Sequence, residues 1–338
     1  LAATTLADAP IIPVSAVTGA GLERLALTLD ELLAHAPARR DIGRPRLSID
    51  RAFTIVGFGT VVTGTLIDGA LTLGQEVDLV PVGRVAKQLR SRVRGLQAHK
   101  KKEETAQPGT RVAVNLANLA VDDIVRGDVL TSPGWLQPTS LVDVRLRLIA
   151  SAAQPLAHNA AVTVHCGAAE VEARVSLLQA DELTPGETAW AQLRLNQPLA
   201  AVRGDFFVIR SPNATLGGGQ IMDAHPRRHK RMQAQVIAAL ERLERGTPQD
   251  LLVQALGVQP PQELAGVADK AGLTLADAQA ALAELVANGQ AIVLGEAGAT
   301  AAARAVVAAT AGWQALVERT RSILAAYHQQ TPLRRGMP

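Results

Sequence analysis

The sequence contains a single cysteine, Cys166, few aromatic residues and no long hydrophobic run. One cysteine excludes a disulfide framework within the chain and is typical of a reducing cytoplasm. An aromatic content of 2% argues against a stacking platform for single-stranded nucleic acid. No apolar run approaches the roughly 18 residues of a membrane helix, and no basic-then-apolar leader opens the chain. We therefore expect a cytoplasmic protein without a membrane partner.

The length and the charge describe a multidomain protein with local basic clusters. A chain of 338 residues is too long for one ordinary core, so two or three domains are expected. The net charge is only +3, so the positions of the basic residues matter more than their sum. One cluster comprises Arg84, Lys87, Arg90, Arg92, Arg94 and Lys100 to Lys102; the other comprises Arg227, Arg228, Lys230 and Arg231. Phosphate contacts and ordinary solvated surface both stay open as interpretations.

The middle of the chain has the pattern of two consecutive β-barrels. Short β-patterned runs such as TVVTGTLI, QEVDLVPV and TRVAVNLA occur over residues 46–135, separated by Gly and Pro turns. A second set occupies 139–226, where LVDVRLRLI alternates apolar and charged residues. Two all-β sets of this size predict two small barrels.

The two ends of the chain are predicted to be mainly helical. In residues 1–38, a short strand, IIPVSA, precedes a helix with leucines at helical spacing, and the run ARRDIGRP follows as a polar linker. Residues 227–298 give four helical pieces and a strand, AIVLG, which together predict a winged helix. Residues 299–338 contain a further Ala-rich helix to about His328, expected to begin a second winged helix.

Residues 47–69, LSIDRAFTIVGFGTVVTGTLIDG, carry the strongest family signal. Their extended runs and spaced glycines resemble the opening of the second domain of a translational GTPase. The run Asp50-Arg51-Ala52-Phe53 before a Gly-Phe-Gly turn resembles the corresponding sequence of the selenocysteine-specific elongation factors. This resemblance covers essentially the whole chain. It implies the end of a G domain, an aminoacyl-binding domain II, a tRNA-contacting domain III and winged helices, with both termini cut inside a module.

The resemblance implies an amino-acid pocket formed by Asp50, Arg51 and Arg111. A selenol is more acidic than a cysteine thiol, whose ordinary pKa is about 8.5, so selenocysteine is an anion at neutral pH while serine is neutral. Two permanently charged guanidinium groups would favour the anion, and Asp50 would orient one of them or accept from the α-amino group. Without the resemblance, the same residues read as an ordinary surface ion pair.

The nucleotide motifs are incomplete in this sequence. Ser15 and Ala16, followed by TGAGL, resemble the fifth guanine-nucleotide motif. No GxxxxGK[ST] loop, Asp-x-x-Gly element or Asn-Lys-x-Asp reader occurs. The family implies GTP and Mg²⁺ for the intact protein, but we expect neither a cofactor nor GTP hydrolysis from these residues alone. Gly217 to Gly219 are expected to form a turn of the last barrel.

Several other residues are candidates for RNA contact or for ordinary surface. The tRNA-contact candidates are His99, Lys100, Lys101, Lys102, Arg227, Arg228 and Lys230. His225 and His229 have metal-like spacing, but their cationic surroundings lack a nearby carboxylate, and no metal site is predicted. The helix expected to read a groove, within TLADAQAALAELVANG, contains no Arg or Lys, which favours a spacer.

The family resemblance predicts selenocysteinyl-tRNA and the ribosome as partners, with a messenger-RNA hairpin bound by C-terminal modules beyond this chain. A monomer is expected. Two alternatives stay open: another translational GTPase, such as an elongation factor Tu or initiation factor relative, and a non-enzymatic winged-helix regulator.

Overall fold

The computed structural model describes residues 6–36, 41–257, 260–295 and 304–330. Its contacts divide the chain into two compact units, Leu1–Asp41 and Ile42–Pro338, which we describe separately. The predicted linker residues 37–40 and the terminal LRRGMP lie outside the described residues.

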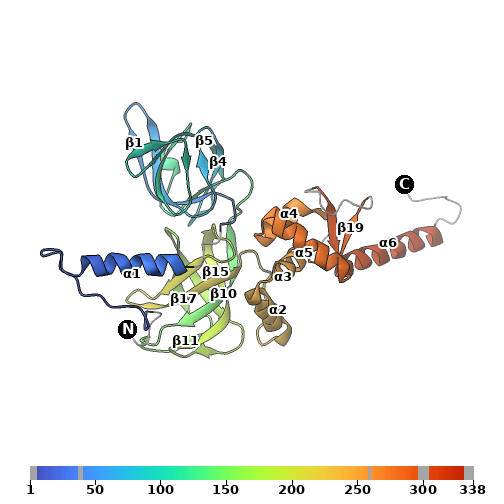
Figure 1. Cartoon of the computed structure of the whole chain (residues 1–338). Helices are drawn as coiled ribbons and strands as arrows, with labels where there is room; N and C mark the ends of the chain where they lie inside the picture. The colour runs from blue at the N-terminus through green and yellow to red at the C-terminus, as the bar shows by residue number, and fades with distance from the viewer. Residues whose placement is uncertain (1–5, 37–40, 258–259, 296–303, 331–338) are drawn as a thin grey trace. The chain divides into compact units, whose positions relative to one another are not determined.

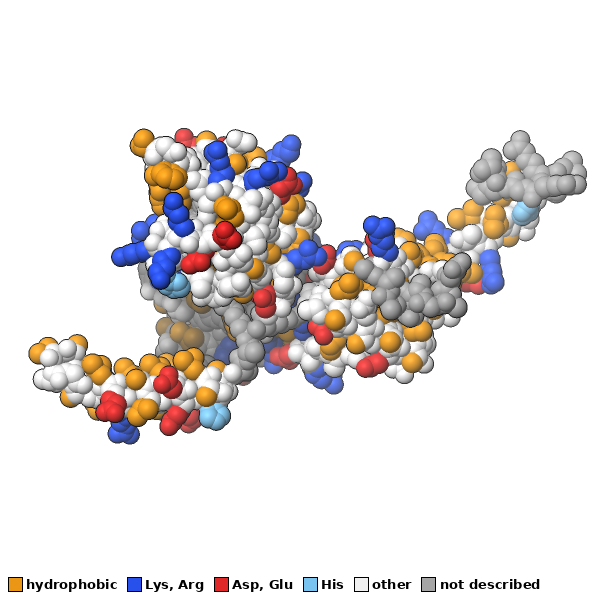
Figure 2. Space-filling model, turned by 45° about the horizontal axis from the view of Figure 1, so that its top comes forward, with side chains coloured by type: hydrophobic (Ala, Val, Ile, Leu, Met, Phe, Trp, Pro, Cys, Tyr) orange, Lys and Arg blue, Asp and Glu red, His pale blue; other side chains and the backbone are white. Residues whose placement is uncertain are grey.

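The first unit contains one helix, α1 (Leu22–His35), among its described residues. The predicted helix is confirmed, none of its residues is buried within this unit, and Figure 2 shows hydrophobic side chains along its length. The predicted strand IIPVSA is wrong, because these residues are irregular. A strand needs a neighbouring strand for its N–H and C=O groups, and the described part of this unit provides none.

The first barrel is built from nine strands between residues 46 and 131. Its sheet has the order β4-β9-β1-β2-β8-β5-β6, and a β4–β5 pairing closes the first six into a ring. The long strands are β1 (Arg46–Ile55), β2 (Gly59–Leu66), β4 (Glu76–Val80), β5 (Leu89–Ala98) and β8 (Arg111–Leu116). The short ones are β3 (Leu71–Thr72), β6 (Lys101–Glu103), β7 (Thr105–Ala106) and β9 (Val129–Thr131), with a 3-10 turn at Val121–Asp123.

The second barrel closes completely in the order β10-β15-β13-β12-β16-β17 (Figure 1). Its strands are β10 (Thr139–Leu148), β12 (Ala161–Cys166), β13 (Ala169–Leu177), β15 (Thr188–Leu199), β16 (Phe206–Arg210) and β17 (Thr215–Asp223). Two short strands pair separately from the barrel: β11 (Leu156–Ala157), between β10 and β12 in sequence, and β14 (Glu182–Leu183), between β13 and β15. The alternating apolar residues of each strand form its core, so the prediction of two barrels is confirmed.

The triple glycine does not form the predicted turn. Gly217, Gly218 and Gly219 lie inside β17 and pair with both β10 and β16. A Cβ atom at Gly217 would lie 2.1 Å from the carbonyl oxygen of Arg147, and one at Gly219 would lie 1.8 Å from that of Arg145. The glycines therefore permit a close approach of neighbouring strands. In a sequence, a Gly-rich run with this role looks the same as one that forms a turn.

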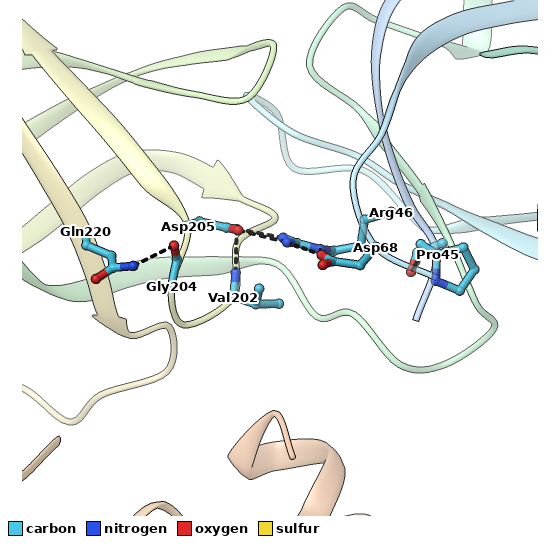
Figure 3. A network of polar contacts seen from close by, with 8 residues as sticks. Pro45, Arg46, Asp68, Val202, Gly204, Asp205 and Gln220 are labelled. Atoms are coloured by element: carbon cyan, nitrogen blue, oxygen red, sulfur yellow. Dashed lines mark hydrogen bonds and ion pairs between the residues drawn. The ribbon is translucent and has the colours of Figure 1, made fainter. Parts of the chain in front are cut away.

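A buried arginine joins the two barrels. The guanidinium of Arg46, on β1, donates to Asp68 of its own barrel at 2.6 Å and to Asp205 of the second barrel at 2.7 and 2.8 Å (Figure 3). Burial alone would lower the pKa of Arg46, but its hydrogen bonds and the charges of Asp205 and Asp68 outweigh this and raise it above its usual value. Val80, Val82 and Val129 of the first barrel pack within the core of the second.

The helical part comprises α2 (Ala234–Arg245), α3 (Pro248–Leu256), α4 (Leu264–Ala271), α5 (Leu275–Ala287) and α6 (Thr310–Gln330). A three-stranded sheet, β18 (Gln262–Glu263), β20 (Val306–Ala309) and β19 (Ala291–Leu294), accompanies them. Thr247 and Thr274 cap α3 and α5 through their side chains. The predicted division at residue 298 separates β19 from β20, although these two strands pair with each other.

Replacing Arg46 with Met should destabilise the barrels strongly, because it leaves the buried Asp68 carboxylate and the partly buried Asp205 carboxylate without their cation. We expect urea unfolding to show a loss of about 3–5 kcal/mol. The control is Arg90→Met, which removes an exposed guanidinium from one buried carboxylate only, that of Asp78, and this carboxylate keeps the N–H of Gly134 as a donor, so the loss should be clearly smaller. Neutralising the carboxylates as well, in Arg46→Met/Asp68→Asn/Asp205→Asn, should restore much of the loss. Equal effects of the Arg46 and Arg90 substitutions would contradict the joint proposed for Arg46.

Candidate functional site

A β-bulge places the predicted pocket residues on the outside of the first barrel. The β1–β2 register shifts between Ile49 and Arg51, so Asp50 is the extra residue of a bulge. Ile49 is fully buried in the core, whereas Arg51 is exposed and pairs with Thr63 of β2. Thr63 also hydrogen-bonds Asp50. Asp50 and Arg51 therefore both lie next to Thr63. In a regular strand, two consecutive side chains would point to opposite faces of the sheet.

Arg111 reaches the same place from the third adjacent strand, β8. Its Nη1 and Nη2 atoms both donate to the Asp50 carboxylate, the latter at 3.0 Å, and Nη2 lies 3.4 Å from the Thr63 hydroxyl. The Thr63 hydroxyl donates to Asp50 Oδ1 at 2.8 Å. The structure thus brings together a carboxylate, a hydroxyl and a guanidinium from β1, β2 and β8.

The charges of this cluster depend on one another. Burial alone would raise the pKa of the Asp50 carboxyl, but hydrogen bonds from Arg111 and Thr63, together with the charges of Arg111 and Arg51, lower it below its ordinary value. The pKa of Arg111 is raised, first by its hydrogen bond to Asp50 and then by that residue's charge. Asp50 therefore stays ionised, and Arg111 stays protonated at every pH of interest.

Arg51 adds a second cation to a cluster that has one carboxylate. Its charge acts on Asp50, yet among the described residues it forms no ion pair. The Asp50–Arg111–Arg51 group has a net positive charge and lies at least partly in solvent. Such a group can hold a small anion, because a guanidinium offers five N–H donors and the Asp50–Thr63 contacts of Arg111 account for three.

Two polar residues of β2 and β8 with structural contacts in this part of the barrel were not identified from the sequence. Thr63 bridges Asp50 and Arg111 through its hydroxyl. Asn115, four residues after Arg111 on β8, donates from its Nδ2 to the carbonyl of Phe58 at 2.8 Å and so fixes the β1–β2 hairpin tip. That tip exposes the apolar side chains of Phe53, Val56 and Phe58. Only the pairing of β1, β2 and β8 shows what these two residues contact, and no sequence motif indicates that pairing.

The first basic cluster is partly neutralised by carboxylates. Arg90 and Arg92 lie on the outer face of β5, and they pair with Asp78 at 2.9 Å and Glu76 at 3.4 Å. Arg84 pairs with the buried Asp128 at 2.5 Å. Figure 2 shows acidic side chains among the basic ones on the surface turned to the viewer. These arginines are therefore poorer candidates for phosphate contact than their number in the sequence suggests.

The tRNA-contact candidates around residue 100 form a hairpin tip. His99 and Lys100 both have positive φ angles, 51° and 65°, and connect β5 to β6 as a two-residue turn. Such a turn normally takes Asn-Gly, so two other residues here are conformationally costly. His99 and Lys100 to Lys102 are all exposed.

The second basic cluster lies against the second barrel. Arg227, Arg228 and Lys230 are exposed, as RNA contact would require, whereas His229 is partly buried on Asp143 at 2.7 Å. His225 lies next to Asp223, whose carboxylate accepts from the His225 backbone N–H. The two histidines thus meet carboxylates of β10 and β17, which the sequence did not reveal.

The guanine-motif candidates lie in a turn before α1. The Ser15 carbonyl accepts from the N–H of Gly19 at 2.9 Å, and the Ser15 hydroxyl accepts from the N–H of Thr18 at 3.2 Å. Ala16 is exposed at the start of this turn. The loop is therefore held by its own hydrogen bonds.

Comparisons with known proteins identify both barrels. Residues 59–131 match the family model of elongation factor Tu domain 2, and residues 143–228 match that of the selenocysteine-specific elongation factor β-barrel domain. A selenocysteine-specific elongation factor of Desulfomicrobium baculatum is 43% identical over 280 residues, covering 82% of this chain and 42% of that protein. The Escherichia coli protein of the same name is 33% identical, covering 71% and 36%. An elongation factor 1-alpha of Pyrobaculum aerophilum is 30% identical, covering 64% and 54%.

The barrels and their matches define the class as translation elongation factors with a Tu-type second domain. Within that class, the chain belongs with the selenocysteine-specific elongation factors, whose β-barrel domain it contains. The family predicted from the sequence is confirmed. The chain spans well under half the length of these selenocysteine-specific relatives. Within its described part, no helix has both the length and the hydrophobicity to cross a bilayer.

Arg111→Met should raise the pKa of Asp50 toward its ordinary range, because it removes the main groups that lower it. Carboxyl-carbon NMR titration measures this directly. Because the folded pKa is lowered, Asp50 stabilises the fold above its unfolded pKa of about 3.9, and this stability disappears as pH falls through the folded value. Arg90→Met is the control and should shift Asp78 but leave Asp50 unchanged. An unshifted Asp50 in Arg111→Met would refute the coupling.

Proposed function

We propose that this chain supplies the aminoacyl- and tRNA-binding barrels of a factor that delivers selenocysteinyl-tRNA to the ribosome at recoded UGA codons. The observation that carries the proposal is the Asp50–Arg51–Arg111 group on the outer face of a Tu-type barrel. Three strands and a bulge bring these residues together. The names of the matched relatives support selenocysteine as the cargo.

The chemistry of the group suits a selenolate better than a hydroxyl. Arg111 and Arg51 would stabilise the anionic side chain, while serine on the same tRNA would gain only neutral hydrogen bonds. Hydrogen bonds to charged groups contribute about 1.5–3 kcal/mol, against about 1 kcal/mol for neutral ones. Asp50 would hold Arg111 in place and accept from the free α-amino group. Discrimination then depends on charge rather than on the small difference in size.

The remaining contacts would come from the second barrel and its basic segment. Arg227, Arg228 and Lys230 would bind tRNA phosphates, as would Lys100 to Lys102 at the β5–β6 tip. The exposed positions of these side chains support this role, and a duplex backbone rewards each cation through counterion release.

In the intact protein, GTP with Mg²⁺ would drive the cycle, and the Ser15–Ala16 turn would contribute to guanine binding. The α3–α5 helices with the β18–β20–β19 sheet have the composition of a winged helix. Because α5 contains no Arg or Lys, we assign this module a spacer role. Binding of a messenger-RNA hairpin would belong to other modules.

A general elongation factor is the second candidate. The Tu-type second domain and the archaeal elongation factor 1-alpha relative favour it. Such a factor would bind aminoacyl-tRNAs without regard to side-chain charge. A winged-helix regulator is less well supported, because the helix expected to enter a groove lacks cations.

Arg111→Gln should weaken binding of selenocysteinyl-tRNA about 10- to 100-fold, the size of a charged hydrogen bond, while seryl-tRNA binding changes little. Filter binding with both charged forms of one tRNA measures the ratio. Arg90→Gln is the matched control: its guanidinium is 59% exposed and carboxylate-paired, against 57% for Arg111. Equal losses for both tRNAs would favour a general factor and reject the charge-selective pocket.

A further inference from the structure

The segment 225–231, His-Pro-Arg-Arg-His-Lys-Arg, connects the second barrel to α2 without regular structure. From Arg228 to Arg231 its side chains nevertheless alternate between solvent and barrel, while Arg227 before them is also exposed. His229 and Arg231 contact the barrel, whereas Arg228 and Lys230 are exposed. A free charged linker would show no such alternation, so the segment is docked.

A buried carboxylate fixes the centre of this segment. Asp143, on the outer face of β10, is only 1% exposed because the segment covers it. Its Oδ2 lies 2.7 Å from His229 Nε2, and its Oδ1 accepts from Gln192 Nε2 at 2.8 Å. A buried carboxylate requires such partners, since an unpaired one is strongly unfavourable.

Gln192 holds the backbone of the same segment. Its Nε2 donates to the Arg227 carbonyl at 3.0 Å, and its Oε1 lies 3.4 Å from the His229 N–H. Binding the C=O of one residue and the N–H two residues later resembles what a neighbouring parallel strand does. Asp143 and Gln192 are themselves cross-strand partners on β10 and β15, so the two anchors form one rigid pair.

Arg231 anchors the other end. Its guanidinium donates to the carbonyls of Leu177 and Ala180 at 2.8 and 2.7 Å and pairs with Asp181 at 2.6 Å. The N–H of Met232 then donates to the Leu178 carbonyl at 2.9 Å. Arg228 and Lys230 flank the docked His229 in sequence, and both are exposed. In an extended chain such residues are about 7 Å apart, twice the rise of roughly 3.3 Å per residue.

We infer that Asp143 is a positioning residue, which with Gln192 and His229 holds Arg228 and Lys230 in a fixed strip for the sugar-phosphate backbone of RNA. The inference rests on the proposed RNA-binding function and adds a requirement to it: the cations must be held, not merely present. Two exposed cations on a docked segment favour a regularly spaced anion such as an RNA backbone, because ordering long side chains in advance reduces the entropy lost on binding.

The protonation of His229 gives the positioning role a pH dependence that a loss of folding alone would not produce. The hydrogen bond that His229 donates to the Asp143 carboxylate raises the pKa of His229, burial opposes this, and the charges of Asp143 and Asp223 add to it. Asp223, on β17, faces His225 of the segment and Gln254 of α3, and Gln192 on β15 completes the surroundings. The contacts among Asp143, Gln192 and His229 are here called the clasp. Because the folded pKa of His229 is raised, the clasp is complete below about pH 6.5 and weakens as pH rises through the folded pKa.

The test measures binding of a 5′-labelled tRNA to the full chain, by fluorescence anisotropy between pH 6 and pH 9 and over a salt series. Asp143→Asn, which keeps the side-chain shape, should weaken binding on the order of tenfold at pH 6.5 and remove the wild-type decline in affinity with pH. His229→Arg, which keeps a permanent cation on Asp143, should retain affinity and also remove that decline.

Arg228→Gln/Lys230→Gln separates the two proposals. It should reduce the salt slope by about two, one for each phosphate that the protein no longer neutralises, and an unchanged slope would reject the RNA contact itself. If that double substitution weakens binding while Asp143→Asn binds like the wild type, the RNA contact stands and the positioning role is wrong. Thermal unfolding of each variant, with His229→Gln as the second disruption of the clasp, identifies any loss that is caused by misfolding.

Discussion

The guanidinium of Arg46 connects two barrels that each have a complete core of their own. It binds a carboxylate on either side and is almost entirely shielded from water, so its desolvation is balanced only when both partners are in place. Valines of the first barrel pack within the second core beside it. Arg46 and these valines therefore link the first barrel, which carries the Asp50–Arg111 group, to the second, which carries the 225–231 segment.

Polar residues on the outer faces of the strands account for much of the organisation that surrounds these cores. On the second barrel, the outer row of β10 and β15 is covered by the docked basic segment and by α2. Arg145 lies 4.7 Å from the ring centre of Trp190 and pairs with Glu244 of α2. Trp190 packs with Leu240 and Leu243 of the same helix. The helical part is thus attached through side chains that a barrel would otherwise expose.

Alternation along the strands allowed much of this fold to be predicted from sequence. The inward row of LVDVRLRLI was assigned correctly, because burial follows a period of two. The burial of Asp143, on the opposite row, could not be predicted, since the residue that covers it is 86 positions away. The glycine run was misassigned for a similar reason: a turn and a close approach of strands need the same residue type.

The candidate pocket was predictable only as a set of residues. The family resemblance named Asp50, Arg51 and Arg111, but nothing in the sequence required a bulge or indicated that Thr63 bridges them. For His225 and His229 we predicted no metal site because we expected no carboxylate nearby, whereas the structure places each beside a different carboxylate. The contacts of these residues depend on how the strands pair and where the chain folds back, and residue type alone does not reveal this.

The extra residue in β1 has a consequence for how the candidate site can change. Because Asp50 and Arg51 both lie outside while Ile49 stays in the core, the residues of the candidate site are separated from those that maintain the barrel. Exchanges at the outer positions alter charge and hydrogen bonding without leaving a cavity or a strained neighbour. One scaffold can therefore acquire a new preference through few substitutions, and the bulge makes the first barrel adaptable as well as stable.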